Sequence, residues 1–154
     1  MRRLRALRVA VSAWLAVLCG CAQPQLSPSA IQTQAIPAGM ARIWVYREYE
    51  PYETLGRPYI RLNGGVVGIS EPGGVLFRDV PPGSYTVTAD TVGRDVNQFV
   101  NVALAAGQSA FVKIESASLW ESDLNYRADT FYTRAIPSDI AATELARQRF
   151  HFGG

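Results

Sequence analysis

The sequence contains few of the side chains that most often bind metal ions or act as catalytic nucleophiles. Its 154 residues include one histidine, His151, and two cysteines, Cys19 and Cys21. Zinc sites are built from several such side chains, and a Ser-His-Asp triad needs a firmly positioned histidine. We therefore expect no metal ion, no cofactor and no catalytic residue. Hydrolysis by carboxylates alone stays open, because no spacing singles out a pair among the 13 acidic residues.

A long hydrophobic run is missing from the N-terminal region. The apolar run Val9–Leu18 is too short to cross a bilayer as a helix, which takes about 20 residues. Four arginines, at positions 2, 3, 5 and 8, precede it. A basic start followed by a short apolar run is typical of a secretory signal peptide. We predict that residues 1–20 are such a signal peptide.

The apolar run ends in Leu18-Cys19-Gly20-Cys21, and this segment resembles the lipobox of bacterial lipoproteins. The resemblance implies that Cys21 receives a diacylglycerol and that the signal peptide is removed before it. Cys19 is unusual at its position, but it is small. Ala22 stands where enterobacterial lipoproteins retained at the inner membrane carry Asp, which favours the inner leaflet of the outer membrane, facing the periplasm. The alternative is an ordinary secretory signal with a spare cysteine.

Removal of the signal peptide changes the charge of the chain. Residues 1–20 contain four of the 15 Lys and Arg residues and no Asp or Glu, so the remaining chain has a net charge of −2. A basic surface for nucleic acid is therefore not expected. Residues 21–40 are rich in Pro, Gln, Ser and Ala, and this composition predicts a flexible tether between the lipid and a folded domain.

Short runs of alternating apolar residues follow between residues 41 and 115. Their period of two is that of a half-buried strand. In the run at 75–80, the pattern leaves open whether Val75 and Phe77 or Leu76 and Val80 face the core. We expect an all-β fold, an antiparallel β-sandwich over residues 41–136. Its seven or so strands are predicted at 43–46, 59–62, 66–69, 75–80, 85–90, 96–104 and 110–115.

Five turns are predicted between these strands, two of them at Glu71–Gly74 and Gly93–Asp95. Asn63-Gly64 indicates a type I′ hairpin, and Ala105–Gln108 is interpreted as the turn of another. The clearest pattern is Pro81-Pro82-Gly83, where the prolines cannot donate ladder hydrogen bonds and Gly83 provides the positive φ that a type II turn requires. We predict a hairpin at this point, with Pro81, Pro82, Gly83 and Tyr85 as its structural residues.

The order and spacing of four segments are similar to the bacterial lipoprotein family called domain of unknown function 2846. These segments are the opening strand Arg42–Arg47, the hairpin Leu62–Gly68, the turn region Phe77–Val87 and the closing segment Ala106–Lys113. More distantly, the Pro-Gly-x-Tyr turn resembles small sandwich modules of the PEGA and carboxypeptidase-regulatory type. The resemblance covers about residues 41–116 and implies an envelope β-sandwich without known catalysis. The family offers no functional residues to carry over.

The pattern is weaker after Ser116. Thr130–Arg134 predicts one extra strand, and a helix is expected to begin at Pro137-Ser138, with Ser138 as N-cap and Asp139 in the first turn. The apolar stripe of this helix is thin, so the helix is expected to cover the sandwich as a lid or to fray. We predict that residues 137–154 form a short helix and a tail.

The segment between the first two strands, residues 48–59, is longer than a hairpin requires. It contains Tyr49, Tyr52 and Tyr59 together with three glutamates and two prolines. Long loops with their own composition are often functional, and tyrosine provides a large contact area at low entropic cost. We hypothesise that these tyrosines contact a partner. The alternative is that they cap an open end of the sandwich.

Three functional classes are compatible with these features. We favour a lipid-anchored, non-catalytic binding or adaptor module of the bacterial envelope. Its partners are then a membrane, through Cys21, and another envelope protein or a cell-wall component. The second class is a passive structural or accessory lipoprotein, and the third is an unrecognised hydrolase.

Replacement of Cys21 by serine tests the lipid anchor. Only the Cys21 sulfur can take the diacylglycerol, so we expect the Cys21→Ser variant to lose all incorporation of a labelled fatty acid and to appear as a soluble or uncleaved product. The Cys19→Ser variant is the matched control and should keep the label. Equal labelling of the wild type and the Cys21→Ser variant would refute lipidation.

Overall fold

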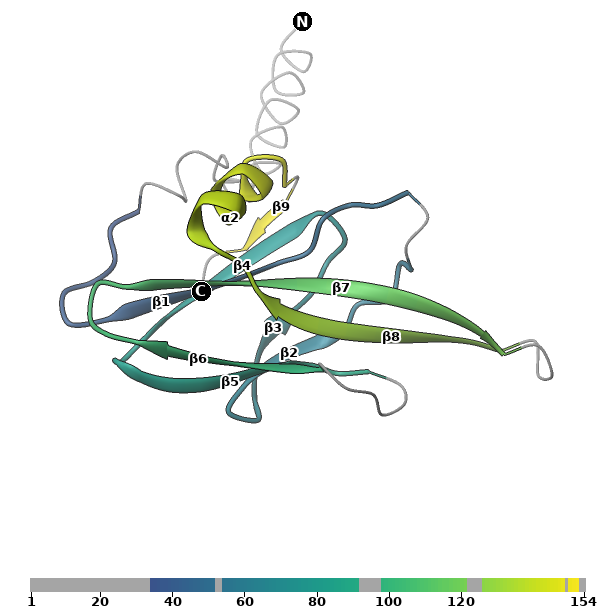
Figure 1. The fold of residues 1–154 in the computed structure, drawn as a ribbon, viewed down its shortest axis with the longest axis horizontal. Coiled ribbons are helices and arrows are strands. Elements are labelled where there is room, and N and C mark those ends of the chain that lie inside the picture. The colour runs from purple at the N-terminus through teal and green to yellow at the C-terminus, as the bar shows by residue number, and fades with distance from the viewer. Residues whose placement is uncertain (1–33, 52–53, 92–97, 122–125, 149, 153–154) are drawn as a thin grey trace, which may run out of the picture.

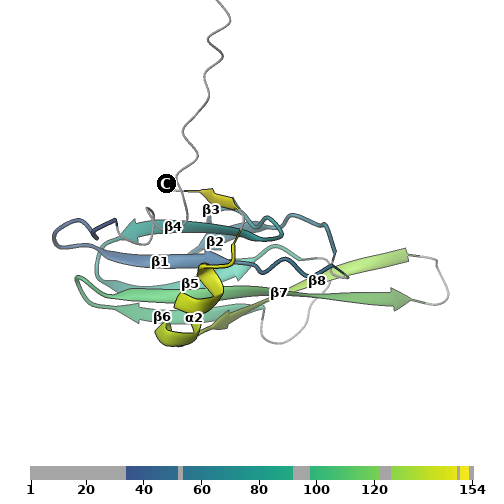
Figure 2. The same ribbon diagram turned by 90° about the horizontal axis from the view of Figure 1, so that it is seen from above.

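Two β-sheets packed face to face and one short helix make up the described part of the chain (Figures 1 and 2). The computed structural model describes residues 34–51, 54–91, 98–121, 126–148 and 150–152. Among these residues, no helix is long and apolar enough to span a bilayer. The elements are β1 (Ala41–Tyr46), β2 (Tyr59–Leu62), β3 (Gly65–Ile69), β4 (Gly74–Val80), β5 (Gly83–Ala89), β6 (Phe99–Leu104), β7 (Ser109–Glu121), β8 (Tyr126–Ala135), α2 (Ser138–Leu145) and β9 (Phe150–Phe152).

The larger sheet, sheet A, has the strand order β8-β7-β1-β4-β9, and the smaller, sheet B, has the order β3-β2-β5-β6. Neighbouring strands are antiparallel except in the pairs β1–β7 and β4–β9, which are parallel. The predicted all-β sandwich with a C-terminal helix is confirmed. The seven strands expected before residue 116 are β1 to β7, and the extra strand is β8. Strand β9 comes from the segment predicted as a tail and extends sheet A beside β4.

Strand β1 is buried on both of its faces. Side chains of alternate residues point to opposite sides of a strand. Ile43 therefore lies between the sheets, whereas Trp44 lies on the outer side of sheet A. The interior core consists of Ala41, Ile43, Val45, Ile60, Leu76, Val80, Val87, Ala89, Val102, Leu104, Val112, Ile114 and Phe131. The outer cluster consists of Trp44, Tyr46, Val75, Phe77, Ala141 and Leu145.

Strand β4 is covered on both faces in the same way. Leu76 and Val80 belong to the interior core, and Val75 and Phe77 belong to the outer cluster. The sequence left open which of these two pairs faces a core, and the structure shows that both do. The reason is that α2 covers the outer side of sheet A (Figure 1).

Helix α2 is the predicted lid on the sandwich. Its buried residues, Ala141 and Leu145, pack in the outer cluster. The predicted start of the helix is wrong by one residue, because Pro137 occupies the N-cap position and Ser138 is already helical, with no side-chain capping bond. Asp139 lies in the first turn as expected, where its negative charge is favourable.

The hairpin predicted at Asn63-Gly64 is confirmed. Strands β2 and β3 pair in antiparallel fashion on either side of it. Asn63 has a φ of 48° and Gly64 a φ of 85°. Positive φ at both central residues is the signature of a type I′ turn, whose twist matches that of the strands it joins.

The hairpin predicted at Pro81-Pro82 is wrong. Strand β4 belongs to sheet A and β5 to sheet B, so the two prolines carry the chain from one sheet to the other. Proline has no N–H to donate to the hydrogen-bond ladder of a sheet. This property suits a segment where the chain leaves a sheet as well as it suits a hairpin turn. Gly83 is the first residue of β5, and its φ of 158° is close to extended backbone. A type II turn would need about +80° at that position.

The turn at Ala105–Gln108 needs the same correction, since it leads from β6 in sheet B to β7 in sheet A. The turn itself forms as expected, because the backbone N–H of Gln108 donates to the carbonyl oxygen of Ala105 at 3.1 Å. Type II geometry after a proline is found instead at Pro72-Gly73, where Gly73 has a φ of 73°.

Tyr85 stabilises the crossing between β4 and β5. Its ring packs against the interior core, and its hydroxyl donates a hydrogen bond of 2.6 Å to the carbonyl oxygen of Pro81, four residues earlier. Tyrosine corners of other β-sandwiches use the same bond to hold a strand to the connection that precedes it. Tyr85 therefore stabilises a sheet-to-sheet crossing, in place of the hairpin that was predicted there.

Replacement of Tyr85 by phenylalanine removes this bond and keeps the ring. We expect the free energy of unfolding to fall by about 0.5–1.5 kcal/mol, the usual net value of such a hydrogen bond. The Tyr59→Phe variant is the control, since it removes a hydroxyl from a half-exposed ring and should leave stability unchanged. Equal denaturant midpoints for the Tyr85→Phe variant and the wild type would contradict this role.

Candidate functional site

Of the three tyrosines predicted to bind a partner, the structure describes Tyr49 and Tyr59. Tyr49 is 45% exposed, and Tyr59 is 50% exposed. Tyr59 is the first residue of β2 and so is part of sheet B rather than of the loop. Tyr52 lies outside the described residues, as does the lipidation residue Cys21. The role of residues 48–59 as a binding loop stays a prediction.

The described part of that loop is held to the sandwich by Arg47, which directly follows β1. Arg47 is only 1% exposed, and its guanidinium donates to the carbonyl oxygens of Thr54 and of Gly56, the latter at 2.8 Å. It also lies 5.2 Å from the centroid of the Phe131 ring. A buried charge must be paired to be tolerated. These contacts therefore fix residues 54–56 against the domain.

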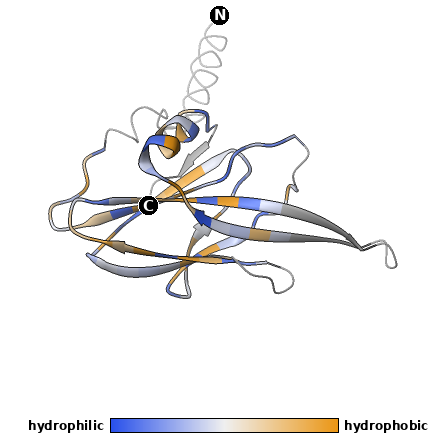
Figure 3. Cartoon of the chain, in the orientation of Figure 1, coloured by the Kyte–Doolittle hydropathy of each residue, from blue (hydrophilic) through white to orange (hydrophobic). Residues whose placement is uncertain are grey.

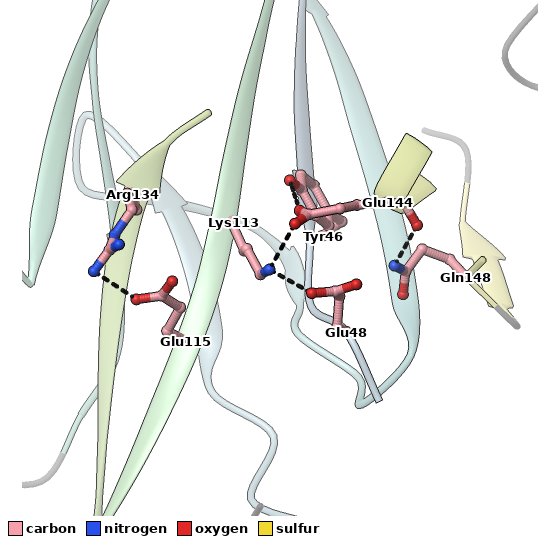
Figure 4. Close-up of polar contacts among 7 residues, drawn as sticks. All are labelled: Tyr46, Glu48, Lys113, Glu115, Arg134, Glu144 and Gln148. Atoms are coloured by element: carbon pink, nitrogen blue, oxygen red, sulfur yellow. Dashed lines mark hydrogen bonds and ion pairs between the residues drawn. The ribbon is translucent and has the colours of Figure 1, made fainter. Parts of the chain in front are cut away.

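A group of polar side chains joins α2 to β1 and β7 (Figure 4). Lys113 contacts the carboxylates of Glu48 and Glu144, the latter at 3.0 Å. The Tyr46 hydroxyl donates to Glu144 at 2.6 Å, and the Gln148 amide donates to the backbone oxygen of Glu144 at 2.8 Å. We call Tyr46, Glu48, Lys113, Glu144 and Gln148 the α2 clamp. Its members come from distant parts of the chain, and no sequence motif identified them.

Contacts within the clamp shift the pKa values of Tyr46, Lys113 and Glu144 away from neutrality. Burial by itself raises the pKa of Glu144, but hydrogen bonds from Tyr46 and Lys113 outweigh burial, so the pKa is lowered. Burial opposes the charge of Lys113, but its bonds to Glu48 and Glu144 raise its pKa overall. Burial and the bond to Glu144 raise the pKa of Tyr46. A general acid or base works best with a pKa near the reaction pH. The clamp is therefore suited to holding a helix rather than to transferring protons.

The outer face of sheet B is bare in the described part of the chain, whereas α2 lies over the outer face of sheet A (Figures 1 and 2). In sheet B, Ile60, Val67 and Val100 face the interior core, so the side chains that alternate with them face solvent. Tyr59, Val66 and Phe99 alternate with them in this way, and Ile69 lies beside its cross-strand partner Tyr59 because a register shift in the β2–β3 pair breaks the alternation of β3. These four large apolar residues are between 41% and 58% exposed. We call them the sheet B patch: Tyr59, Val66, Ile69 and Phe99.

An ion pair lies between the apolar residues of the patch. Arg61 and Asp90 form two parallel bonds, of 2.7 and 2.8 Å. Arg61 is paired across the strands with Val66 on one side and with Thr88 on the other, and Thr88 is paired with Phe99. The hydrogen bond from Arg61 lowers the pKa of Asp90 although burial opposes this. The centre of the patch thus carries one positive and one negative charge, and its net charge is zero.

Two hollows adjoin these surfaces. One, of about 460 Å³, lies beside α2 at Arg42, Trp44 and Phe111. The other, the β6–β8 cleft of about 640 Å³, is lined by residues of β6, β7 and β8: Phe99, Val100, Glu115, Ser116, Tyr132, Thr133, Arg134 and Ala135. Among the described residues, no group of three or more His, Cys, Asp or Glu side chains is placed to hold a metal ion.

Sequence reasoning selected Tyr59 but missed Val66, Ile69 and Phe99. The available signal was the presence of apolar residues on both faces of the predicted strands of sheet B. The alternation located the strands, but it did not say which face would be covered. Comparison of the chain with protein-family models, with curated proteins and with solved structures found no match.

Replacement of Glu144 by glutamine tests the clamp. We expect the free energy of unfolding at pH 7 to fall by about 1–2 kcal/mol, because Lys113 loses a charged partner. The pKa of Glu144 is lower in the folded than in the unfolded protein, so its contribution is fully present above about pH 4.5 and is lost as the pH falls through the folded value. The stability difference between wild type and variant should therefore shrink in acid.

Denaturant unfolding at pH 7, 5 and 3 measures this difference. The Glu50→Gln variant, at an exposed position, is the control and should match the wild type at pH 7. A difference that is constant across the three pH values would show that the charge of Glu144 is not what stabilises α2.

Proposed function

We propose that this chain is a lipid-anchored, non-catalytic binding module of the bacterial envelope, which holds a partner protein against the outer face of sheet B. The anchor is the lipid on Cys21, at the inner leaflet of the outer membrane. We also propose that the chain is a member of the bacterial lipoprotein family called domain of unknown function 2846, which its sequence resembles. The observation that carries the binding role is the sheet B patch.

The composition of the patch supports a protein partner. Soluble domains rarely leave several large apolar side chains together on one flat surface unless it contacts something. Aromatic residues and arginine are enriched in protein–protein interfaces, and the patch combines Tyr59 and Phe99 with Arg61. Arg61 and Asp90 neutralise each other's charge. A partner with an uncharged, partly apolar surface therefore fits the sheet B patch best.

The two outer faces of the sandwich differ in a way that favours this choice. On sheet A, the aromatic residues Trp44 and Phe77 are 5% and 3% exposed, in the cluster that includes residues of α2. On sheet B, Phe99 is 58% exposed. Leaving that area in water forgoes about 25 cal/mol for each Å² of apolar surface that a partner would bury. Burial of apolar surface by a partner would therefore contribute more binding free energy on the outer face of sheet B than on the outer face of sheet A.

In-cell photo-crosslinking tests the proposal. A photoreactive amino acid at Thr88, in the centre of the patch, should crosslink a protein partner in the envelope. We expect the double variant Tyr59→Ala, Phe99→Ala to reduce the crosslinked product at least about tenfold, because interface anchors of this kind are worth more than about 1 kcal/mol each. Both side chains are half exposed or more, so the melting temperature should change little.

Two further variants decide between surfaces. Ile140→Ala removes a comparably exposed apolar side chain from α2 and should leave the crosslink unchanged. Tyr49→Ala tests the loop. Loss of the crosslink with Tyr49→Ala but not with the double variant would assign binding to residues 48–59. The absence of any crosslinked protein from Thr88 would favour a passive structural role.

A further inference from the structure

Strand β6 is an unprotected sheet edge. It is hydrogen-bonded to β5 on one side, and no described strand pairs with it on the other. Its sequence, Phe99-Val100-Asn101-Val102-Ala103-Leu104, contains no charged residue and no proline. Its register with β5 runs without a bulge from one end to the other. Figure 3 shows β6 mainly in hydrophobic colours.

The other edges of the two sheets carry the features that normally prevent strand addition. Strand β9 has three residues. Strand β3 has five residues, two of them glycine, and a register shift interrupts its pairing with β2. Strand β8 presents Arg134, which is 65% exposed. An apolar, regular edge of six residues without such protection is a template for another strand.

The space beside β6 is open to an added strand. The β6–β8 cleft lies next to Phe99 and Val100, and it has room for about 640 Å³ between β6 and the ribbon of β7 and β8. Side chains of an added strand that point toward sheet A would enter this cleft. The Glu115–Arg134 ion pair, at 3.0 Å, lies in the same lining.

We propose that the occupant of this edge is a second copy of the same strand, in an antiparallel pair related by a two-fold axis at Asn101. In this register Phe99 lies opposite Ala103 of the second copy, and Val100 lies opposite Val102 of the second copy. Both partners of each pair belong to the same face of the sheet. Phe99 meets the smaller Ala103, the valines at 100 and 102 meet each other, the two Asn101 amides meet each other, and no like charges are opposed.

The lack of charge is what selects a second copy. A two-fold axis places the residue at the axis directly against its own equivalent, so a charge there would repel itself, whereas β6 has no charge to oppose. The pairing joins the two copies of sheet B into one continuous eight-stranded sheet. A pair formed by five or so residues of each strand buries less area than a standard interface, so the association is weak in solution. It goes beyond the proposed function and does not depend on it.

Charge substitution at Asn101 tests the pairing with the full-length protein in mild detergent. The wild type should show concentration-dependent dimers by light scattering. The Asn101→Lys and Asn101→Asp variants should each dimerise about fivefold or more weakly, because like charges are then opposed across the axis. An equimolar mixture of the two variants should recover dimers, and native mass spectrometry should identify them as mixed.

The Thr143→Lys variant is the matched control, since it adds the same charge on the exposed side of α2 and should dimerise like the wild type. Circular dichroism should show that all variants keep the fold. A wild type that is monomeric at every soluble concentration overturns the proposal. A mixture of the Asn101→Lys and Asn101→Asp variants that stays monomeric also overturns the proposal, because opposite charges across the two-fold axis should restore the pair.

Discussion

A buried cation at the start of β1 determines how the chain enters the fold. Arg42 is 1% exposed. Its guanidinium forms bonds of 2.7 and 2.9 Å to Asp79, the residue directly opposite on β4, and donates at 2.7 Å to the carbonyl oxygen of Gln34. It also lies 4.3 Å from the ring centroid of Phe77. Loss of Asp79 would leave the buried charge of Arg42 unpaired, which costs several kcal/mol. The register of β1 against β4 and the path of residues 34–35 are thus set by one side chain.

The rest of the sandwich follows from the double burial of β1. Arg42 and Arg47 lie at the two ends of β1 and are both buried, so the strand needs cover on each face. Sheet B provides one cover and α2 the other, with the α2 clamp holding the helix through Lys113 and Glu144. Among the residues that the structure describes, no helix covers sheet B. The asymmetry between a covered sheet and a bare one is the main reason to place a binding surface on sheet B.

The sequence predicted the strands and turns well because those signals are local. Asn63-Gly64 and the alternation of apolar residues specify backbone conformation without reference to the rest of the chain. What the sequence did not predict is the sheet to which each strand belongs. Pro81-Pro82 and Ala105–Gln108 are good turn sequences for a hairpin and equally good for a crossing between sheets. The outcome depends on apolar residues on both faces of β4, whose cover comes from sixty residues further along the chain. The clamp was missed for the same reason, since Tyr46 and Glu144 meet only in the folded protein.

The central place of β1 in sheet A has a mechanical consequence. The segment that leads toward Cys21 joins the domain at this strand, which pairs with β4 over six residues and with β7 over five. A force applied through that segment along the strand acts on both ladders in shear, so many hydrogen bonds must break at once. A force on an edge strand would instead unzip one ladder bond by bond. Under the lipid anchor proposed for Cys21, the domain could therefore carry load through its middle strand without unfolding from that end.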